Sequence, residues 1–150
     1  MGLFDAINIA GSGLSAERLR MDVTAENLAN AQSTRGADGQ PYRRKEVVLQ
    51  QADGAGFDGA LRTAMGGAQG SASGARGVQV VGIAEDQTPN RQIYDPGHPD
   101  ANAQGYVAMP NVDSVTEMVD LISASRAYEA NVTAMQTAKQ MFVKTLDLLR

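Results

Sequence analysis

The sequence predicts a mainly α-helical fold, with a long helix at each end of the chain and a small β-rich segment between them. Three observations predict it. All five prolines and 13 of the 16 glycines lie between residues 32 and 110. Apolar residues recur every seven positions on both sides of that segment, and short β-branched runs lie within it. Because glycine costs a helix interior about 1 kcal/mol and proline about 3 kcal/mol relative to alanine, only the two ends favour long helices.

The composition excludes several classes of function. The 150 residues include no cysteine, which removes disulfides, thiolate metal sites and cysteine nucleophiles. The net charge of −4 provides no basic field for general nucleic-acid binding. No segment approaches the roughly 20 apolar residues of a membrane span, and Met1–Asp5 lacks the basic start of a secretory signal. We therefore expect no nucleic-acid partner, no membrane insertion and no cleaved signal peptide.

The first region, residues 1–34, contains the predicted N-terminal helix. This helix spans roughly residues 3–30 and would be about 42 Å long at 1.5 Å per residue. Its large apolar residues are spaced by seven: Ile7, Leu14, Met21 and Leu28. Such a repeat produces a narrow apolar seam, which is typical of a helix that packs against a partner helix.

The last region, residues 111–150, contains the predicted C-terminal helix over roughly residues 112–149, about 57 Å long. Its seam has the same period, with a further leucine close beside it: Leu121, Tyr128, Met135, Phe142 and Leu149, then Leu146. Pro110 prevents the helix from starting earlier. Either Asp113 or Ser114 can cap its start.

A capping box is also expected at this helix start. Glu117 follows Ser114 by three positions, the spacing at which the two residues satisfy each other's backbone N–H groups.

The positions beside both seams hold mostly small residues, which bury little area each. Two arrangements are compatible with them. The two helices could form a parallel or antiparallel hairpin within one chain, or they could pack mainly against neighbouring copies or relatives. We favour the second arrangement, a coiled-coil layer between subunits, because one hairpin cannot cover both seams of such long helices.

The middle region, residues 35–110, is predicted to hold a small antiparallel sheet beside the helices. Residues 45–51 and 78–84 are rich in β-branched side chains and predict two strands. A third extended piece covers residues 92–94. The rings expected to pack on this sheet are those of Tyr42 and Tyr94.

A glycine-rich loop is predicted between the first two strands. Gly54 to Gly77 contains eight glycines in 24 positions, and alanine and serine fill much of the rest. This composition buries too little apolar surface to offset the entropy of ordering, so we expect a mobile loop.

Few residues suggest chemistry. His98, the only histidine, lies between Asp95 and Asp100, and such a set could coordinate a metal ion. The prolines and glycine around it are typical of a turn, which we favour. No nucleophile has a base at a supporting spacing. The sequence therefore predicts no catalytic site, no cofactor and no metal site.

The basic triplet Arg43-Arg44-Lys45 allows two interpretations. It could be the solvated start of the first strand. Alternatively, it could contact an acidic neighbour or a polyanionic wall polymer.

Ser12 to Ala31 resembles the N-terminal signature of bacterial flagellar rod and hook proteins, and Asn27-Leu28-Ala29-Asn30 followed by Ser33-Thr34 is its most recognisable part. Four further blocks are similar to the proximal-rod members of this family: residues 41–45, 94–101, 105–112 and 117–131. The resemblance covers nearly the whole chain and is weakest over residues 52–77.

The resemblance implies a structural, non-enzymatic subunit of the flagellar basal body. Family members are exported unfolded and uncleaved through the flagellar type III export apparatus. They polymerise helically into the rod, which crosses the periplasm and transmits motor torque, and their terminal helices form an inner coiled-coil layer. The implied partners are copies of the chain and the rod proteins FliE, FlgB and FlgF.

The expected subunit interface combines the heptad residues with two asparagines of the signature: Ile7, Leu14, Met21, Asn27, Leu28, Asn30, Leu121, Tyr128, Met135, Phe142, Leu146 and Leu149. A contact of residues 54–77 with peptidoglycan or a surrounding ring protein stays open. A competing hypothesis is a cytoplasmic helical adaptor or flagellar export chaperone, which would share the same seams.

Overall fold

The computed structural model describes residues 3–36, 39–52 and 76–148. The elements, in order, are α1 (Leu3–Ala29), β1 (Lys45–Gln51), β2 (Val78–Glu85), β3 (Arg91–Tyr94), β4 (Tyr106–Met109) and α3 (Ser114–Leu148). Both predicted helices and all three predicted strands are confirmed to within two residues at each end. Neither described helix contains a stretch long and apolar enough to cross a membrane.

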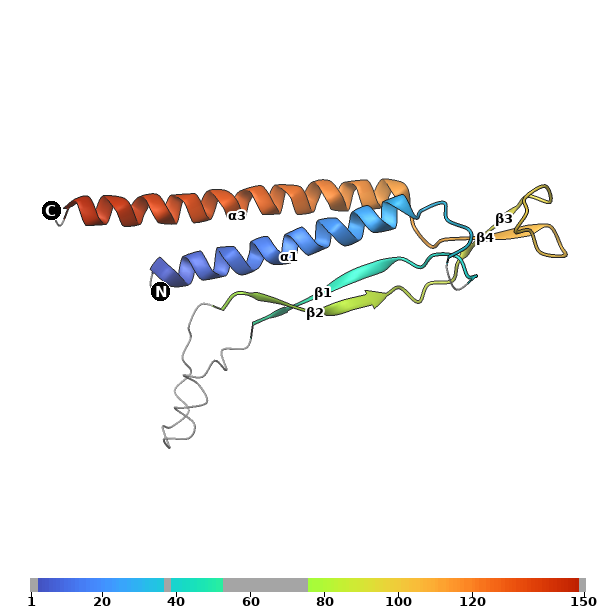
Figure 1. Cartoon of the computed structure of the whole chain (residues 1–150), viewed down its shortest axis with the longest axis horizontal. Helices are drawn as coiled ribbons and strands as arrows, with labels where there is room; N and C mark the ends of the chain where they lie inside the picture. Colours follow the sequence, from blue (N-terminus) through green and yellow to red (C-terminus); the bar gives the residue numbers. More distant parts are fainter. Residues whose placement is uncertain (1–2, 37–38, 53–75, 149–150) are drawn as a thin grey trace, which may run out of the picture.

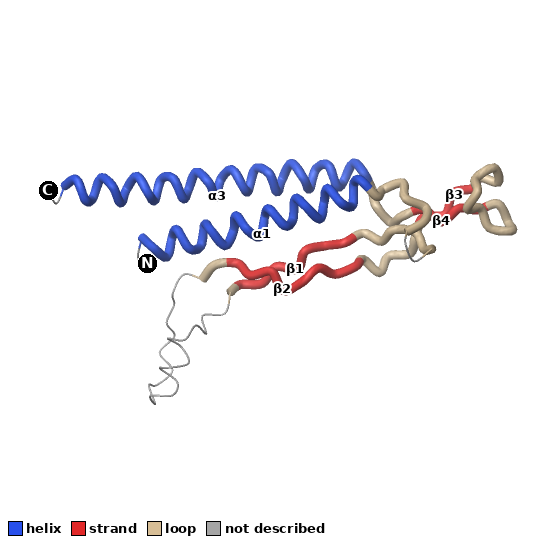
Figure 2. The backbone as a smooth tube through the Cα atoms, viewed as in Figure 1, coloured by secondary structure: helices blue, strands red, loops and turns tan. Residues whose placement is uncertain are grey.

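The elongated molecule has three layers, with α1 lying between α3 and the β1–β2 hairpin (Figure 1). The β3–β4 hairpin lies beyond one end of the helix pair, as the strand colouring of Figure 2 shows. α1 contacts both outer layers and therefore joins α3 to the β1–β2 hairpin.

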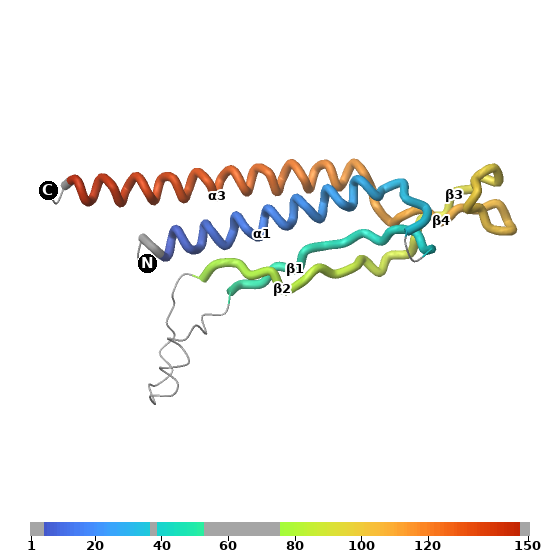
Figure 3. Tube along the Cα trace, in the orientation of Figure 1, coloured from blue at the N-terminus to red at the C-terminus, as the bar shows by residue number. Residues whose placement is uncertain are grey.

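The two helices are antiparallel, so both termini lie at one end of the molecule (Figure 3). Asn27 donates a hydrogen bond to Glu117, and a Cβ added at Gly13 would lie 2.9 Å from the Asn131 amide nitrogen. These pairs are fourteen residues apart on each helix, so they define one continuous register. Gly13 and the small side chains near it therefore let the two backbones approach closely.

The helix α3 has 35 residues and α1 has 27, so one helix extends past the other. Continuing the register from Gly13 and Asn131 places Leu3 beside residue 141. The last two turns of α3 therefore run beyond the start of α1 (Figure 3). Their apolar side chains are largely exposed, including Met141, Val143 and Leu146.

The buried core of the described residues consists mainly of small and polar side chains. Its apolar members are Ala10, Ala16, Val23, Val107, Val112, Ala124 and Ala138. Its polar members are Thr24, Asn27 and Glu117. A core of this kind buries little area per residue, in agreement with the scarcity of large rings in the sequence.

The strands form two separate two-stranded antiparallel sheets, so the single sheet predicted from the sequence is wrong. In the first hairpin Lys45 pairs with Glu85 and Gln51 with Val78, with an irregularity between Val48 and Leu49. The second sheet pairs β3 with β4, a strand that the sequence analysis missed. All four residues of β4 are apolar, so they show no polar–apolar alternation typical of a strand.

A tight turn shapes the β3–β4 hairpin. Gly105 has a φ of 82°, which only glycine adopts readily, and a Cβ there would lie 2.9 Å from the Tyr94 ring. Tyr94 packs edge-to-face on Tyr106, with ring centroids 5.3 Å apart. Tyr94 therefore packs on a sheet as expected. Tyr42 lies beside the first strand, with Lys45 Nζ 5.5 Å from its ring centroid, and its hydroxyl group donates to Asn27 on α1.

The predicted capping box is wrong, and Asp113 alone caps α3. Its carboxylate accepts hydrogen bonds from the Val115 N–H at 3.1 Å and the Thr116 hydroxyl at 3.1 Å. Glu117 does not reach back to Ser114, since its side chain is buried against Asn27 and Arg44.

The predicted glycine-rich loop falls mostly on residues 53–75, which lie outside the described residues. The division of the chain into regions 1–34, 35–110 and 111–150 stays a prediction.

Candidate functional site

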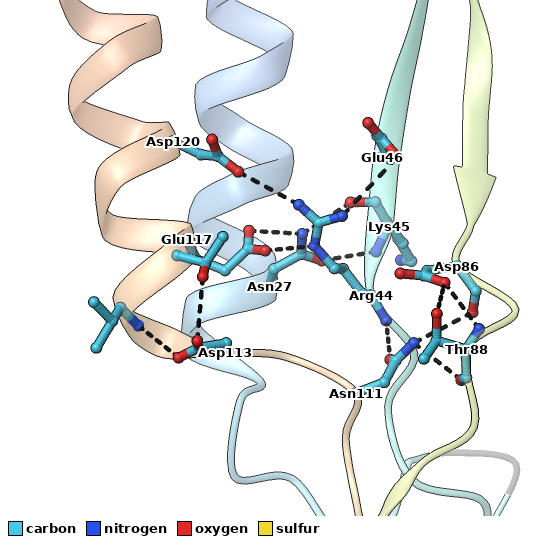
Figure 4. A network of polar contacts seen from close by, with 12 residues as sticks. Asn27, Arg44, Lys45, Glu46, Asp86, Thr88, Asn111, Asp113, Glu117 and Asp120 are labelled. Carbon is cyan, nitrogen blue, oxygen red and sulfur yellow. Dashed lines mark hydrogen bonds and ion pairs between the residues drawn. The ribbon is translucent and has the colours of Figure 1, made fainter.

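The most elaborate polar arrangement lies where the end of α1, the start of β1 and the first turns of α3 meet (Figure 4). We call it the polar junction and define it by seven residues: Asn27, Tyr42, Arg44, Lys45, Asn111, Glu117 and Asp120. Two of them that are directly hydrogen-bonded, Asn27 and Glu117, are 90 residues apart in the chain.

Asn27 is the centre of the polar junction and is 1% exposed. Its amide nitrogen donates to the Lys45 carbonyl at 2.8 Å and to Glu117 Oε2 at 3.0 Å. Its amide oxygen accepts from the Lys45 N–H at 2.9 Å and from the Tyr42 hydroxyl at 2.9 Å. An asparagine side chain offers two donors and two acceptor sites, so the full hydrogen-bonding capacity of Asn27 is used.

Glu117 contributes a buried carboxylate, also 1% exposed. Its Oε1 accepts from Arg44 Nε at 2.6 Å, and Arg44 also lies 3.4 Å from Asp120 and 3.9 Å from Glu46. A buried charge is tolerated only when it is paired and hydrogen-bonded, and here both conditions hold. The hydrogen bond to Glu117 raises the pKa of Arg44, so the guanidinium stays charged.

The polar junction extends to Tyr42 and Lys45. Burial, followed by the charges of Glu26, Glu117 and Glu85, raises the pKa of Tyr42 to about 12. Lys45 Nζ lies 2.6 Å from Glu26 Oε1 and 5.5 Å from the centroid of the Tyr42 ring. The phenol therefore stays neutral, and its hydroxyl group donates a hydrogen bond to Asn27.

Asn111 ties the chain before α3 to both sides of the first hairpin. Its side-chain oxygen accepts from the Arg44 N–H at 2.8 Å, and its amide nitrogen donates to the carbonyls of Asp86 and Thr88 at 3.4 and 3.3 Å. Hydrogen bonds from Thr88 lower the pKa of the Asp86 carboxyl group. The polar junction thus joins α1, α3, β1 and the segment after β2.

Two residues of the basic triplet fit neither interpretation. Arg44 forms an ion pair with Glu117 and Lys45 forms one with Glu26, both within the same folded chain. These ion pairs could not be predicted from the sequence, because the partners lie on other elements. One signal was available: Glu117 precedes Ala124, Asn131 and Ala138 at seven-residue spacing, and a charge in a seam position requires a partner.

The predicted interface residues differ in their exposure. Seven of them are half-buried: Ile7, Leu14, Met21, Leu28, Leu121, Tyr128 and Met135. Phe142 and Leu146 are exposed, and Leu149 lies outside the described residues. Asn30 donates to the Glu26 carbonyl and accepts from the Ser33 hydroxyl, which finishes α1. Whether these side chains meet another subunit stays a prediction.

The residues around His98 form a turn, as predicted. The His98 N–H donates to the Asp95 carbonyl, and His98 Nδ1 accepts from the Asp100 N–H at 3.1 Å. Among the residues that the structure describes, no group of three or more His, Cys, Asp and Glu side chains could hold a metal ion.

Two family profiles match opposite ends of the chain. The profile of the flagella basal body rod protein matches residues 7–37, and that of the C-terminal region of flagellar basal body rod FlgEFG proteins matches residues 103–148. The flagellar basal-body rod protein FlgC of Escherichia coli O6:H1 is 48% identical over 148 residues, which cover 99% of this chain and 98% of the relative. The chain belongs to the FlgC family of flagellar basal-body rod proteins.

Other FlgC proteins match to a similar extent. That of Salmonella typhimurium is 47% identical, with 99% of this chain and 98% of the relative covered. That of Bacillus subtilis is 47% identical over 152 residues, with 99% of each chain covered. These matches support a rod subunit rather than an adaptor or an export chaperone.

Four of the seven residues of the polar junction lie in segments that match the family profiles. Asn27 lies in the first matched segment, and Asn111, Glu117 and Asp120 lie in the second. The two segments that carry the family signatures are therefore the two that Arg44 and its neighbours bind together.

Proposed function

We propose that the chain is a structural subunit of the proximal rod, which polymerises helically through its terminal helices into a shaft that transmits motor torque. The observation that carries this proposal is full-length similarity to FlgC rod proteins, combined with a helix pair that leaves its large apolar residues only half covered. No catalytic role is part of the proposal.

The terminal helices are proposed to form an inner coiled-coil layer. The half-buried heptad residues of α1 and α3 would complete their burial against neighbouring subunits, and so would the exposed end of α3. Burial of apolar area at about 25 cal/mol per Å² would then stabilise the assembly rather than the single chain. Heterologous contacts that do not close into a ring produce a helical filament.

The proposed partners are further copies of the chain, the rod proteins FliE, FlgB and FlgF, and the flagellar type III export apparatus. The proposed location is the part of the basal body that crosses the periplasm, reached without a cleaved signal. Peptidoglycan or a surrounding ring protein is a further candidate contact. The absence of cysteine suits a chain that is exported unfolded and assembles in an oxidising compartment.

Within such a shaft the polar junction would act as a rigid bracket. It holds the β1–β2 hairpin and the segment after β2 to the helix pair by charged and neutral hydrogen bonds. Torque that reaches the helices would then be passed to the middle region without a flexible link.

The test replaces the chromosomal gene with variants and isolates detergent-extracted basal bodies. The natural chain should copurify with them. Leu28→Asp or Phe142→Asp should abolish swimming while the variant is still exported, because a buried charge would prevent close packing between subunits. Normal swimming of both variants, or absence of the natural chain from basal bodies, would contradict the proposal.

A further inference from the structure

The two sides of α3 that flank its contact with α1 differ in side-chain size. One side carries large side chains, with Ser125 as the single small residue among them, and we call it the bulky row: Leu121, Tyr128, Val132 and Met135. The other side carries only small side chains, and we call it the small row: Ser123, Ala127, Ala130, Ala134 and Thr137. Residues three, four or seven positions apart share one side of a helix, so each row is a continuous surface.

The position of α1 places the two rows on opposite sides of the helix contact. Asn131 lies against Gly13, so it marks the line of α3 that faces α1. At 100° per residue, Val132 lies about 100° to one side of this line and Ala130 about 100° to the other side. The two rows therefore point to opposite flanks of the helix pair.

Neither row is fully covered within the chain. Among the described helices and strands, only α1 packs on α3. All four members of the bulky row are half-buried, and Ala130 and Ala134 of the small row are exposed. Burial of the remaining apolar area against a neighbour is favourable, provided that the neighbour has room for large side chains.

Charged residues at the outer edges of the two rows complement each other. Arg126 lies at the edge of the small row and Glu129 at the edge of the bulky row, both on the side of α3 away from α1. Both side chains are exposed, and neither forms an ion pair with another described residue. When the small row of one molecule meets the bulky row of another, these opposite charges come to the same edge of the contact.

We propose that the bulky row of one copy packs against the small row of a second copy, so that neighbouring α3 helices lie side by side. The proposal rests on the rod-subunit function above and adds the residues of one lateral contact. Since the two rows differ, the contact is heterologous and repeats from copy to copy.

The direction and register of the neighbouring helices follow from symmetry and charge. Helical assembly gives every copy the same direction along the shaft, so the two α3 helices are parallel. In near register, Arg126 of one copy and Glu129 of the next are three residues apart along the axis, or about 4.5 Å. Near register also gives the longest overlap between the two rows.

The packing follows the knobs-into-holes arrangement of helical layers. In near register, Val132 of one copy lies at the level of Ala130 and Ala134 of the next. The small side chains there leave a hole for the valine and let the helix axes approach to about 8 Å, the lower end of the usual range. A large side chain in the small row would fill this hole.

The size of the two rows explains when the contact forms. Their nine side chains fall short of the roughly 20–30 residues per side of a stable interface. Isolated copies should therefore stay monomeric, and the contact should form in the rod, where each copy has neighbours on both flanks.

A matched pair of leucine variants tests the hole. Ala134→Leu should cause loss of swimming, because the added side chain occupies the space that the bulky row of the next copy needs. Thr133→Leu, the neighbouring exposed position that points away from both rows, should retain swimming. Both isolated chains should keep the urea midpoint of the natural chain, which shows that they fold. Equal swimming of the two variants would overturn the proposal.

The absence of cysteine permits a direct cross-linking test. Ala130→Cys and Val132→Cys are combined in one chain, expressed in place of the natural gene, and oxidised in isolated basal bodies. The proposal expects a ladder of covalent dimers, trimers and higher oligomers, because the two thiols point to opposite neighbours. Cells that express the two single variants together should yield dimers only, and either single variant alone should yield no oligomer.

The outcomes separate this contact from others. Gln50→Cys with Gln79→Cys, which face each other across the first hairpin, forms a disulfide within one chain and verifies the oxidation. If that control reacts and rods that contain the Ala130–Val132 double variant yield no ladder, the lateral contact is wrong and the rod-subunit function stands. The contact is also wrong if a single variant alone forms a dimer, or if the adduct contains a different rod protein. Absence of the natural chain from rods contradicts the rod-subunit function instead.

Discussion

The two ends of the helix pair are built on different principles. At one end the polar junction satisfies every hydrogen-bonding site of Asn27 and pairs the buried Glu117 with Arg44. At the other end α3 runs beyond α1 with Met141, Val143 and Leu146 exposed. The polar groups at one end are therefore satisfied within the chain, whereas the other end offers apolar surface that a single chain leaves uncovered.

The difference follows from what each kind of interaction requires. Hydrogen bonds and ion pairs need exact partners at fixed geometry, which one folded chain supplies most reliably. Apolar burial is non-directional and can be supplied by any well-shaped neighbour. A subunit that must have a defined shape and also assemble can therefore use polar contacts for the first task and apolar surface for the second.

The largest expected effect comes from breaking the buried ion pair. Arg44→Met leaves Glu117 uncompensated, and removing one partner of a buried pair typically costs about 3–5 kcal/mol. Leu146→Ser, at the exposed end of α3, should change the free energy of unfolding by less than about 0.5 kcal/mol. Urea titrations of the isolated chain, followed by circular dichroism at 222 nm, measure both values. Equal values would remove the contrast between the two ends.

A smaller loss is expected within the asparagine signature itself. Asn27→Ala leaves the buried Lys45 N–H and Lys45 carbonyl without their partner and should cost about 2 kcal/mol. Asn30→Ala removes exposed hydrogen bonds and should cost about 0.5 kcal/mol. The same titration decides the order. A larger loss for Asn30→Ala would show that the signature serves the end of α1 rather than the polar junction.

Two glycines of α1 test how closely the two helices approach between the ends. Gly11→Ala meets no atom within 4 Å and should raise the free energy of unfolding by about 1 kcal/mol through helix propensity. Gly13→Ala should gain less, because its Cβ would lie 2.9 Å from Asn131 and that side chain must move. Thermal unfolding of both variants tests this. An equal gain would mean that the helices do not approach closely at Gly13.

A further effect is expected at high pH. The pKa of Tyr42 is raised from 10.0 to about 12, so the unfolded chain loses the phenolic proton first. The stability from this group is complete below about pH 10 and is lost as the pH rises to about 12. The free energy of unfolding, measured across this pH window, should fall less steeply for Tyr42→Phe than for the natural chain. Identical slopes for Tyr42→Phe and the natural chain would contradict the assignment.

Much of the fold could be predicted from the order of residue types. The confinement of proline and glycine to residues 32–110 predicted both helices, and the runs at 45–51 and 78–84 predicted β1 and β2. These elements depend on helix and strand propensity and on hydrophobic period, which are properties of consecutive residues. The strand at residues 106–109 was missed because its four residues are all apolar and show no alternation.

The polar junction could not be predicted in the same way. Asn27 and Glu117 are 90 residues apart, and Arg44 and Glu117 are 73 apart. Read singly, a polar residue in a helix suggests solvent exposure, and here both helical members are buried. Only their antiparallel register shows that the amide and the carboxylate face each other.

The sequence by itself therefore determined where the helices lie, that their seams are narrow, and that the chain resembles rod and hook proteins. The tertiary structure decided that the helices are antiparallel, which polar groups neutralise one another, and which apolar faces stay exposed. The reason is physical. Local conformation depends on neighbours along the chain, whereas charge pairing and burial depend on neighbours in space, which only the folded chain brings together.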